Sequence, residues 1–291
     1  ENIVCVITQP DRPKGRGRKV LPPPVKELAL QASIPVLQPQ SVKDEAFHAQ
    51  LHEFEPDLIA LTAYGKILPG SIINLPRLGT INVHGSLLPK YRGAAPIQWA
   101  LIKGETETGV TIMQMDEGVD TGDILLQEKI AIEPEDTAGT LSVKLAELGG
   151  AALGKALDLL RRDRLKPMKQ DGKQASLAPL LKKEDGLVDW SQPAVKLSGL
   201  IRGLDPWPTT YTTLSGKRLR LFSSEVVEKN NCQSTFSGPG IVCRADRDGL
   251  LVTTGNGCLL IREIQAEGSR RMAVDAFISG NPIEPGTLLG Q

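Results

Sequence analysis

The first half of the chain alternates short apolar runs with segments of helical periodicity. Branched apolar residues dominate the short runs, which is typical of buried strands. The predicted strands are 3–8, 36–37, 58–63, 81–83, 110–114 and 124–132, and the predicted helices are 25–32, 42–54 (with Ser41 as N-cap), 95–102 and 140–162. Residues 9–19 are rich in Gly and Pro and predict a loop. Strands alternating with helices indicate an α/β domain with a Rossmann-like, mostly parallel sheet.

The pattern changes after about Arg164. The next residues, up to Lys183, are charged and rich in turn formers, and they lack a clear period. One predicted helix, 194–202, ends at the Pro-containing breaker 205–208. Five short predicted strands with Gly turns follow, at 211–214, 219–227, 240–244, 250–254 and 258–266. This half of the pattern predicts a small β-barrel of the OB type.

The length supports two domains. The chain has 291 residues, and a domain usually takes about 100–200. We expect a catalytic-type α/β domain at 1–163, a basic linker at 164–182 and the barrel domain at 183–291. The chain opens inside an apolar run without an initiator Met. We therefore expect that residues which belong before residue 1 are missing.

Composition excludes two broad classes of protein. Hydrophobic residues make up 40% of the chain and the formal net charge is zero, which is unlike a disordered protein. No apolar run approaches the roughly 18 residues of a membrane span, so no membrane association is expected. The four cysteines are scattered, without a CxxC pair. Scattered cysteines predict free thiols in a reducing compartment.

The zero net charge hides a strong separation of charge. Residues 9–26 carry an excess of five positive charges and residues 155–183 an excess of six, whereas 105–136 carry an excess of nine negative charges. A third basic cluster, 217–220, lies on the predicted barrel. Each basic segment alone is compatible with a solvated surface. Together they favour a surface that binds along the backbone of a polyanion.

Asn82 and His84 are the first candidates for chemistry. Alternate residues of a strand share a face, so the two side chains project together near the end of a predicted strand, where ligands bind in open α/β sheets. An amide and an imidazole can both donate to an oxygen that gains negative charge. The alternative is a structural histidine. The turn-forming residues that follow, 85–93, favour a ligand site because they allow close approach of the backbone.

A histidine in such a site normally needs a carboxylate to orient it. The acidic loop 115–123 contains four carboxylates. Their spacing does not show whether Asp116, Asp120 or Asp123 would orient the histidine. The other two histidines, His48 and His52, are four residues apart and could share a helix face, but an exposed face is the simpler interpretation. HExxH, GxGxxG and P-loop motifs are absent. We therefore expect neither a metal nor a nucleotide phosphate site.

Four segments together resemble the methionyl-tRNA formyltransferase family of folate-dependent formyltransferases. They are QPDRPKGRGRK (9–19), NVHGSLLPKYRGAAPIQWAL (82–101), MDEGVDTGDIL (115–125) and IRGLDPWPTTYT (201–212). The middle two are common to folate-dependent formyltransferases, whereas the basic loop and the C-terminal domain carry the tRNA assignment. The resemblance implies transfer of a formyl group from 10-formyltetrahydrofolate, a co-substrate, to the α-amino group of initiator methionyl-tRNA. It implies no metal. The family begins with a strand and a helix before the first strand seen here, so the resemblance implies that these two elements are missing from the start of the catalytic domain.

The resemblance also assigns residues. Asn82, His84 and Asp120 correspond to the catalytic residues of the family, and Ser86, Leu87, Leu88 and Pro89 to its folate-binding segment. Arg16 matches a position implicated in tRNA recognition, and the basic loop adds Arg12, Lys14, Arg18 and Lys19. The implied protein is a monomer of the bacterial type in the cytoplasm or an organelle. The alternatives are a 10-formyltetrahydrofolate hydrolase, a formyltransferase for a small amine, or a tRNA-binding module without activity.

Overall fold

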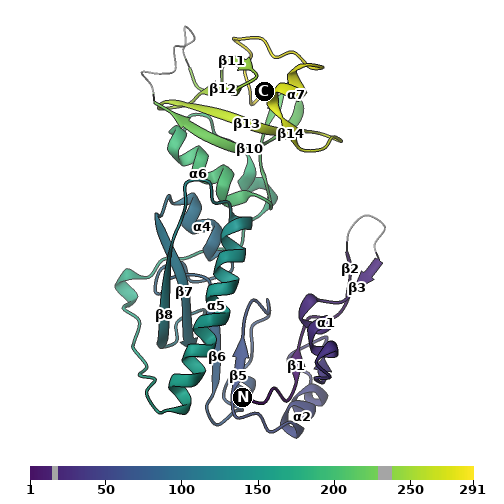
Figure 1. Cartoon of the computed structure of the whole chain (residues 1–291), viewed down its shortest axis with the longest axis vertical. Coiled ribbons are helices and arrows are strands. Elements are labelled where there is room, and N and C mark those ends of the chain that lie inside the picture. Colours follow the sequence, from purple (N-terminus) through teal and green to yellow (C-terminus); the bar gives the residue numbers. More distant parts are fainter. Residues whose placement is uncertain (15–18, 229–237) are drawn as a thin grey trace. The chain divides into compact units, whose positions relative to one another are not determined.

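The computed structural model describes residues 1–14, 19–228 and 238–291 (Figure 1). The helices are α1 (Pro24–Gln31), α2 (Glu45–Glu53), α3 (Gly70–Ile73), α4 (Pro96–Ile102), α5 (Ala138–Arg161), α6 (Ala194–Leu204) and α7 (Val274–Ile278), with 3-10 turns η1 (Gly172–Gln174) and η2 (Lys183–Gly186). The strands are β1 (Val6–Ile7), β2 (Arg12–Lys14), β3 (Lys19–Leu21), β4 (Val36–Leu37), β5 (Ile59–Leu61), β6 (Thr80–His84), β7 (Glu107–Gln114), β8 (Ile124–Ala131), β9 (Thr210–Leu214), β10 (Lys217–Val227), β11 (Val242–Asp246), β12 (Gly249–Thr253), β13 (Cys258–Ala266) and β14 (Met272–Ala273). None of the helices within these ranges has both the length and the apolar character needed to cross a membrane.

The chain divides into two compact units that are interleaved in sequence. The first unit contains residues 1–84, 111–127 and 151–174, and the second contains 85–110, 128–150 and 175–291. The division passes through β7, β8 and α5. The second unit therefore joins the C-terminal third of the chain to segments of the predicted α/β domain.

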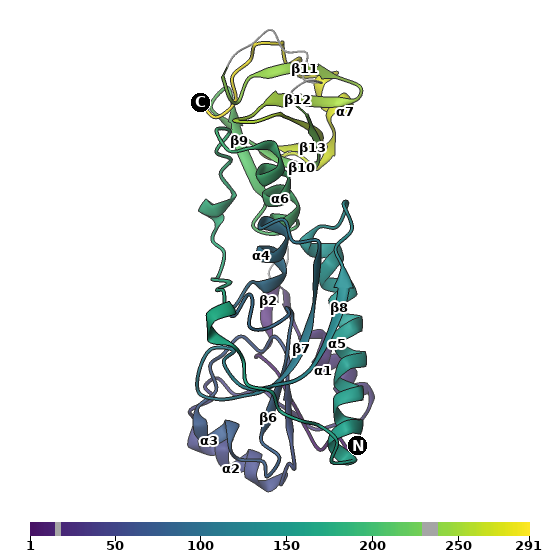
Figure 2. The ribbon, with the colours of Figure 1, turned by 90° about the vertical axis from the view of Figure 1, so that its left-hand side faces the viewer.

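The central sheet is mixed and not mostly parallel. Its order is β5-β6-β7-β8, and Figure 2 shows β6 and β7 side by side. Strands β5 and β6 are parallel, but β6 and β7 are antiparallel. A second parallel pair, β1 with β4, forms a separate two-stranded sheet. The apolar pattern predicted these strands because it reports burial, but the direction of β7 depends on where the connection through α4 returns the chain.

The predicted loop at 9–19 contains a short hairpin. Strands β2 and β3 pair in antiparallel register, and Arg16 and Arg18 lie outside the described residues. At the base of the hairpin, Lys26 Nζ donates to Asp11 Oδ2 at 2.8 Å and to Gln38 Oε1 at 2.6 Å. Hydrogen bonds from Lys26 and then Gln38 hold the pKa of the Asp11 carboxyl below its usual value. Strands of three residues are too short for a periodic signal.

Helix α2 begins later than predicted. Its N-cap is Asp44, whose Oδ1 accepts a hydrogen bond from the amide of Ala46 at 3.0 Å. Ser41 instead accepts from the amide of Lys43 at 3.2 Å and lies before the helix. Both residue types are good N-caps. The choice between them depends on which turn lets Phe47 and Leu51 reach the core.

The C-terminal domain contains one sheet, and the described residues include no strand pairing that closes it, so the barrel stays a prediction. The order of the sheet is β11-β12-β13-β10-β9, with β14 paired to β13, and each neighbouring pair is antiparallel. Alternate residues of β10, such as Leu219 and Leu221, are buried in its core. Cys258 is disulfide-bonded, which differs from the expected free thiol, whereas Cys5 and Cys243 are free.

Within the second unit, α6 packs closely on α4. A Cβ at Gly199 would lie 2.8 Å from the carbonyl oxygen of Leu101, and one at Gly203 would lie 2.9 Å from the carbonyl oxygen of Gln98. Only glycine permits this approach. The backbone of α4, which follows the candidate site segment, is in this way held by the helix that precedes the C-terminal sheet.

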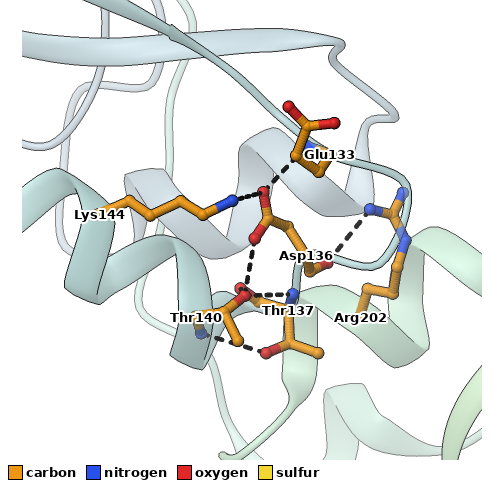
Figure 3. A network of polar contacts seen from close by, with 6 residues as sticks. All are labelled: Glu133, Asp136, Thr137, Thr140, Lys144 and Arg202. Carbon is orange, nitrogen blue, oxygen red and sulfur yellow. Dashed lines mark hydrogen bonds and ion pairs between the residues drawn. The ribbon is translucent and has the colours of Figure 1, made fainter.

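A buried carboxylate secures the start of α5 in the second unit (Figure 3). The Asp136 carboxylate accepts hydrogen bonds from Lys144 Nζ at 2.8 Å, Thr140 Oγ1 at 2.9 Å and the amide of Glu133 at 2.9 Å. Arg202 of α6 donates to the Asp136 carbonyl oxygen at 3.2 Å. Burial raises the pKa of the Asp136 carboxyl, but these bonds outweigh burial and hold the pKa below its usual value.

Replacing Asp136 with alanine is expected to destabilise the fold by about 2–3 kcal/mol, because buried donors lose a charged acceptor. Since the folded state lowers the pKa, the carboxylate stabilises the protein at neutral pH, and this contribution disappears as the pH falls below about 4. Chemical denaturation at pH 7 and pH 3 measures both effects. The control Asp158→Ala removes an exposed ion pair with Arg161 on the same helix and should cost less than about 0.5 kcal/mol. Equal losses in the two variants would contradict this prediction.

Candidate active site

Asn82 and His84 lie on the same face of β6, in the first unit. Asn82 pairs across the sheet with Leu61 of β5 and Met113 of β7, and His84 pairs with Thr111 of β7. Asn82 is half-buried, and His84 is buried with 5% of its surface exposed. Strand alternation thus brings an amide and an imidazole to one face at the carboxyl end of β6.

The acidic loop between β7 and β8 brings one carboxylate to this histidine. Asp120 Oδ2 lies 3.5 Å from His84 Nδ1, and their side chains are 16% and 6% exposed. Asp116 instead accepts from the hydroxyl of Thr121 at 2.7 Å, within its own loop. Asp123 Oδ1 lies 3.2 Å from Lys169 Nζ. The spacing left these three aspartates open and the family resemblance selected Asp120, which is the one of the three that the structure pairs with His84.

The Asp120 backbone has an unusual conformation. Its φ is +52°, in the left-handed region that aspartate tolerates better than most residues. A residue in this region persists where the surrounding structure holds it. The side-chain amide of Gln170 donates to the carbonyl oxygens of Asp120 at 2.9 Å and Gly122 at 2.7 Å. Sequence reasoning missed Gln170 because it lies in the predicted linker, and an amide bonded to carbonyls has no motif.

This geometry determines what the cluster can do. With Nδ1 of His84 directed at Asp120, Nε2 lies on the other side of the ring and can serve a ligand. The carboxylate of Asp120, 3.5 Å from Nδ1, can hold the imidazole ring in one orientation. Asn82 adds an amide donor on the same face. The three groups suit a reaction in which an oxygen gains negative charge.

The segment Ser86–Pro89 forms a tight turn in the second unit. Ser86 Oγ donates to the carbonyl oxygen of Lys90 at 2.6 Å, and Ser86 and Leu88 are buried. Leu87 and Pro89 are half-buried. Leu87 packs so closely on Gly109 that a Cβ there would lie 2.7 Å from its Cδ2. The buried side chains therefore shape the turn, and Leu87 and Pro89 stay partly exposed.

Residues after this turn are held by the start of the C-terminal segment. Tyr91 has a φ of +61°, its amide donates to Ser176 Oγ at 2.9 Å, and its hydroxyl donates to Glu105 at 2.7 Å. Burial, and then the bond to Glu105, raises the pKa of Tyr91. At Gly93 a Cβ would lie 2.7 Å from the carbonyl oxygen of Ala178. Sequence reasoning also missed Ser176, for the same reason as Gln170.

The predicted tRNA-binding residues are only partly described. Arg12 is exposed, and its guanidinium donates to Gln9 Oε1 at 3.4 Å. Lys14 ends β2 and Lys19 begins β3. On the C-terminal sheet, the Arg218 guanidinium lies 4.1 Å from the centre of the Tyr211 ring. Cation–π contact of this kind keeps a positive charge beside an aromatic face.

The other two histidines, His48 and His52, lie on α2. His48 Nε2 lies 2.8 Å from the carbonyl oxygen of Val42, and His52 is exposed on α2. Across the three described ranges, no group of three His, Cys, Asp or Glu side chains is arranged to hold a metal ion.

Comparisons with known proteins point to one family. The model of the formyl transferase domain matches residues 1–157, and that of the formyl transferase C-terminal domain matches residues 180–282. The methionyl-tRNA formyltransferase of Desulfotalea psychrophila is 56% identical over 289 residues, which is 99% of this chain and 88% of that protein. The methionyl-tRNA formyltransferase of Geobacter metallireducens is 49% identical, over 100% of this chain and 91% of its own length.

A solved structure shares the fold. HypX from Aquifex aeolicus, in complex with tetrahydrofolic acid, superposes with a TM-score of 0.65 and 18% identity. The match covers 100% of this chain and 51% of HypX.

Proposed function

The chain belongs to the formyltransferase family, and we propose that it transfers the formyl group of 10-formyltetrahydrofolate to the α-amino group of methionyl-tRNA. The observation that carries this proposal is the cluster of Asn82, His84 and Asp120 at the carboxyl end of β6. Full-length relatives named for this activity support the choice of substrates.

The cluster supplies what formyl transfer to an amine requires. As the amine attacks the formyl carbon, the carbonyl oxygen gains negative charge. The Asn82 amide and the His84 imidazole donate to that oxygen, and Asp120 keeps the imidazole oriented and stabilises its charge. The attacking amine loses a proton, and the folate nitrogen that departs takes one up, directly or through water.

The turn at Ser86–Pro89 fits a flat folate ligand. Its buried Ser86 and Leu88 fix the backbone, while Leu87 and Pro89 remain partly exposed as apolar surface for the ligand. Folate enters and leaves with each turnover, so it acts as a co-substrate. We propose no metal for this reaction.

We further propose a division of labour along the chain. Residues 1–163 would form the catalytic domain, 164–182 a basic linker, and 183–291 a tRNA-binding domain of OB-like barrel type. The matched family domains at 1–157 and 180–282 support these limits. We also propose that the protein is a monomer and works in the cytoplasm, and the bacterial relatives support the bacterial type.

Formyl-transfer assays test the proposed function. The protein is incubated with labelled 10-formyltetrahydrofolate and one of three acceptors: charged initiator tRNA, a series of small amines, or water alone. We expect formylmethionyl-tRNA as the main product. Transfer only to small amines, or release of formate without an acceptor, would replace the proposal by one of the alternatives. A protein that binds tRNA but transfers nothing would be an inactive binding module.

The basic loop gives a prediction about salt dependence. Replacing both Arg16 and Arg18 with glutamine should weaken tRNA binding. The slope of log Kd against log salt should fall by about one unit per lost phosphate contact. Binding of tetrahydrofolate should not change. Filter binding between 50 and 200 mM salt measures this slope.

The control variant loses the same number of positive charges as the Arg16 and Arg18 variant. Arg77→Gln and Lys43→Gln together remove two exposed positive charges outside the basic segments, and Arg77 already pairs with Asp57. The control should keep the slope of the unmodified protein. An unchanged slope in the Arg16 and Arg18 variant would remove the loop from the tRNA interface.

A further inference from the structure

We propose that Gln170 is a positioning residue that fixes the Asp120 carboxylate beside His84, a role that rests on the proposed function of this site. Gln170 lies in the first unit together with both partners. Its side-chain amide bonds the backbone of the acidic loop, and in this proposal it does not bind a substrate. Its effect passes through the backbone of the acidic loop.

Gln170 forms hydrogen bonds to both ends of one turn in the acidic loop between β7 and β8. A single Nε2 group donates to the carbonyl oxygens of Asp120, at 2.9 Å, and Gly122, at 2.7 Å. The two oxygens belong to residues on either side of Thr121. A carboxamide nitrogen has two hydrogens, so it can hold two carbonyls at once, which a hydroxyl cannot do. Gln170 therefore determines how the backbone turns at Asp120.

The turn needs such a contact. Asp120 has a φ of +52°, which costs free energy for a residue with a Cβ. Gly122 lies so close to the carbonyl of Gln114 that no Cβ fits there. If the two hydrogen bonds from Gln170 were lost, the backbone of Asp120 would rotate towards a more favourable φ. Its carboxylate, already 3.5 Å from His84 Nδ1, would then move away.

Backbone contacts on either side of Gln170 and of the acidic loop hold the two segments together. The backbones of Met168 and Ile124 exchange two hydrogen bonds of 2.8 Å, next to the loop. The amide of Gln114 donates to the carbonyl oxygen of Asp123 at 2.8 Å, which fixes the other side. The Lys169–Asp123 ion pair adds little, because the lysine side chain is 91% exposed. Only the amide of Gln170 reaches the carbonyl of Asp120 among these contacts.

Two matched substitutions test the role. Gln170→Met keeps the length of the side chain but removes both donors. Gln174→Met makes the same change nearby, where the amide bonds only the exposed Asp171 of its own turn. We expect Gln170→Met to lower kcat for formyl transfer about tenfold to a hundredfold, since small misplacements of a catalytic group have effects of this size. The KM for folate should change less than about twofold, and Gln174→Met should match the unmodified enzyme.

A double-variant cycle separates positioning from a general loss of structure. If Gln170 acts through Asp120, the double variant Gln170→Met/Asp120→Asn should have the kcat of Asp120→Asn alone. Losses that multiply would overturn the proposal, as would a normal kcat in Gln170→Met. If Gln170→Met does not fold, Gln170→Glu, which has the same shape and lacks donors when ionised, replaces it in the cycle.

A spectroscopic measurement keeps this inference distinct from the proposed function. The chain has three histidines, so ¹⁵N-histidine labelling gives a simple spectrum in which His84 can be assigned. We expect Gln170→Met and Asp120→Asn to change the tautomer signature of His84, and Gln174→Met to leave it unchanged. An unperturbed His84 signal in Gln170→Met would overturn the inference. An altered signal in a protein that transfers no formyl group would support the positioning role and reject only the proposed function.

Discussion

Replacing His84 with alanine is expected to lower kcat for formyl transfer about 10²–10³-fold, the usual cost of losing one donor to a developing oxyanion. Asn82→Ala should have an effect of similar size, because the two side chains lie on one face of β6. The effect should fall mainly on kcat, since both groups act on charge that develops during the reaction. Steady-state kinetics with saturating folate and varied methionyl-tRNA measure it.

The matched control is His52→Ala. His52 is an exposed histidine on α2, whereas His84 is buried on β6. The control should keep full activity, and the His84 variant should still bind tetrahydrofolate. Near-normal turnover in both His84→Ala and Asn82→Ala would contradict the assignment of these residues.

Replacing Asp120 with asparagine is expected to lower kcat about 10²–10⁴-fold. The change keeps the shape of the side chain but removes the charge that orients and stabilises the imidazole; a comparable change in a Ser-His-Asp triad costs about 10⁴-fold. The lower part of the range applies here, because the oxygen and nitrogen are 3.5 Å apart and Asp120 keeps some exposure to water. Single-turnover measurements separate this chemical effect from release of product.

Asp123→Asn is the control from the same loop. It removes an equal charge, but Asp123 pairs with the exposed Lys169 and not with His84. We expect its kcat to change less than about threefold, as for a weak surface pair. A loss in Asp123→Asn as large as that in Asp120→Asn would mean that the net charge of the loop matters and not the contact with His84.

Net charge shows how an average over the chain can mislead. A value of zero argued against a nucleic-acid ligand, although residues 9–26 and 155–183 are strongly basic. The described contacts refine this picture. Lys26 pairs with Asp11 and Arg161 with Asp158, so part of the basic count is already used within the protein. Asp11 and Asp158 are already subtracted in the excesses of five and six, so these two pairs leave the net charge of each segment unchanged.

The order of strands and helices could be predicted from the chain because burial leaves a periodic signal. Strands β4 and β13 begin and end at the predicted residues, and α5 differs from its prediction by two residues at its start and one at its end. Asn82 and His84 were recognised in the same way, since a strand places alternate residues together without help from the rest of the fold.

The contacts that choose between equivalent residues came only from the tertiary structure. Asp116, Asp120 and Asp123 have the same side chain and similar sequence neighbours, so only the path of the loop brings Asp120 to His84. The direction of β7 likewise depends on the returning connection and not on its apolar pattern. Gln170 and Ser176 lie in a segment with no periodicity, and their roles arise from backbone carbonyls and amides that are distant in sequence. Periodicity is local and can be read along the chain, whereas a contact between distant backbone groups exists only once the chain has folded.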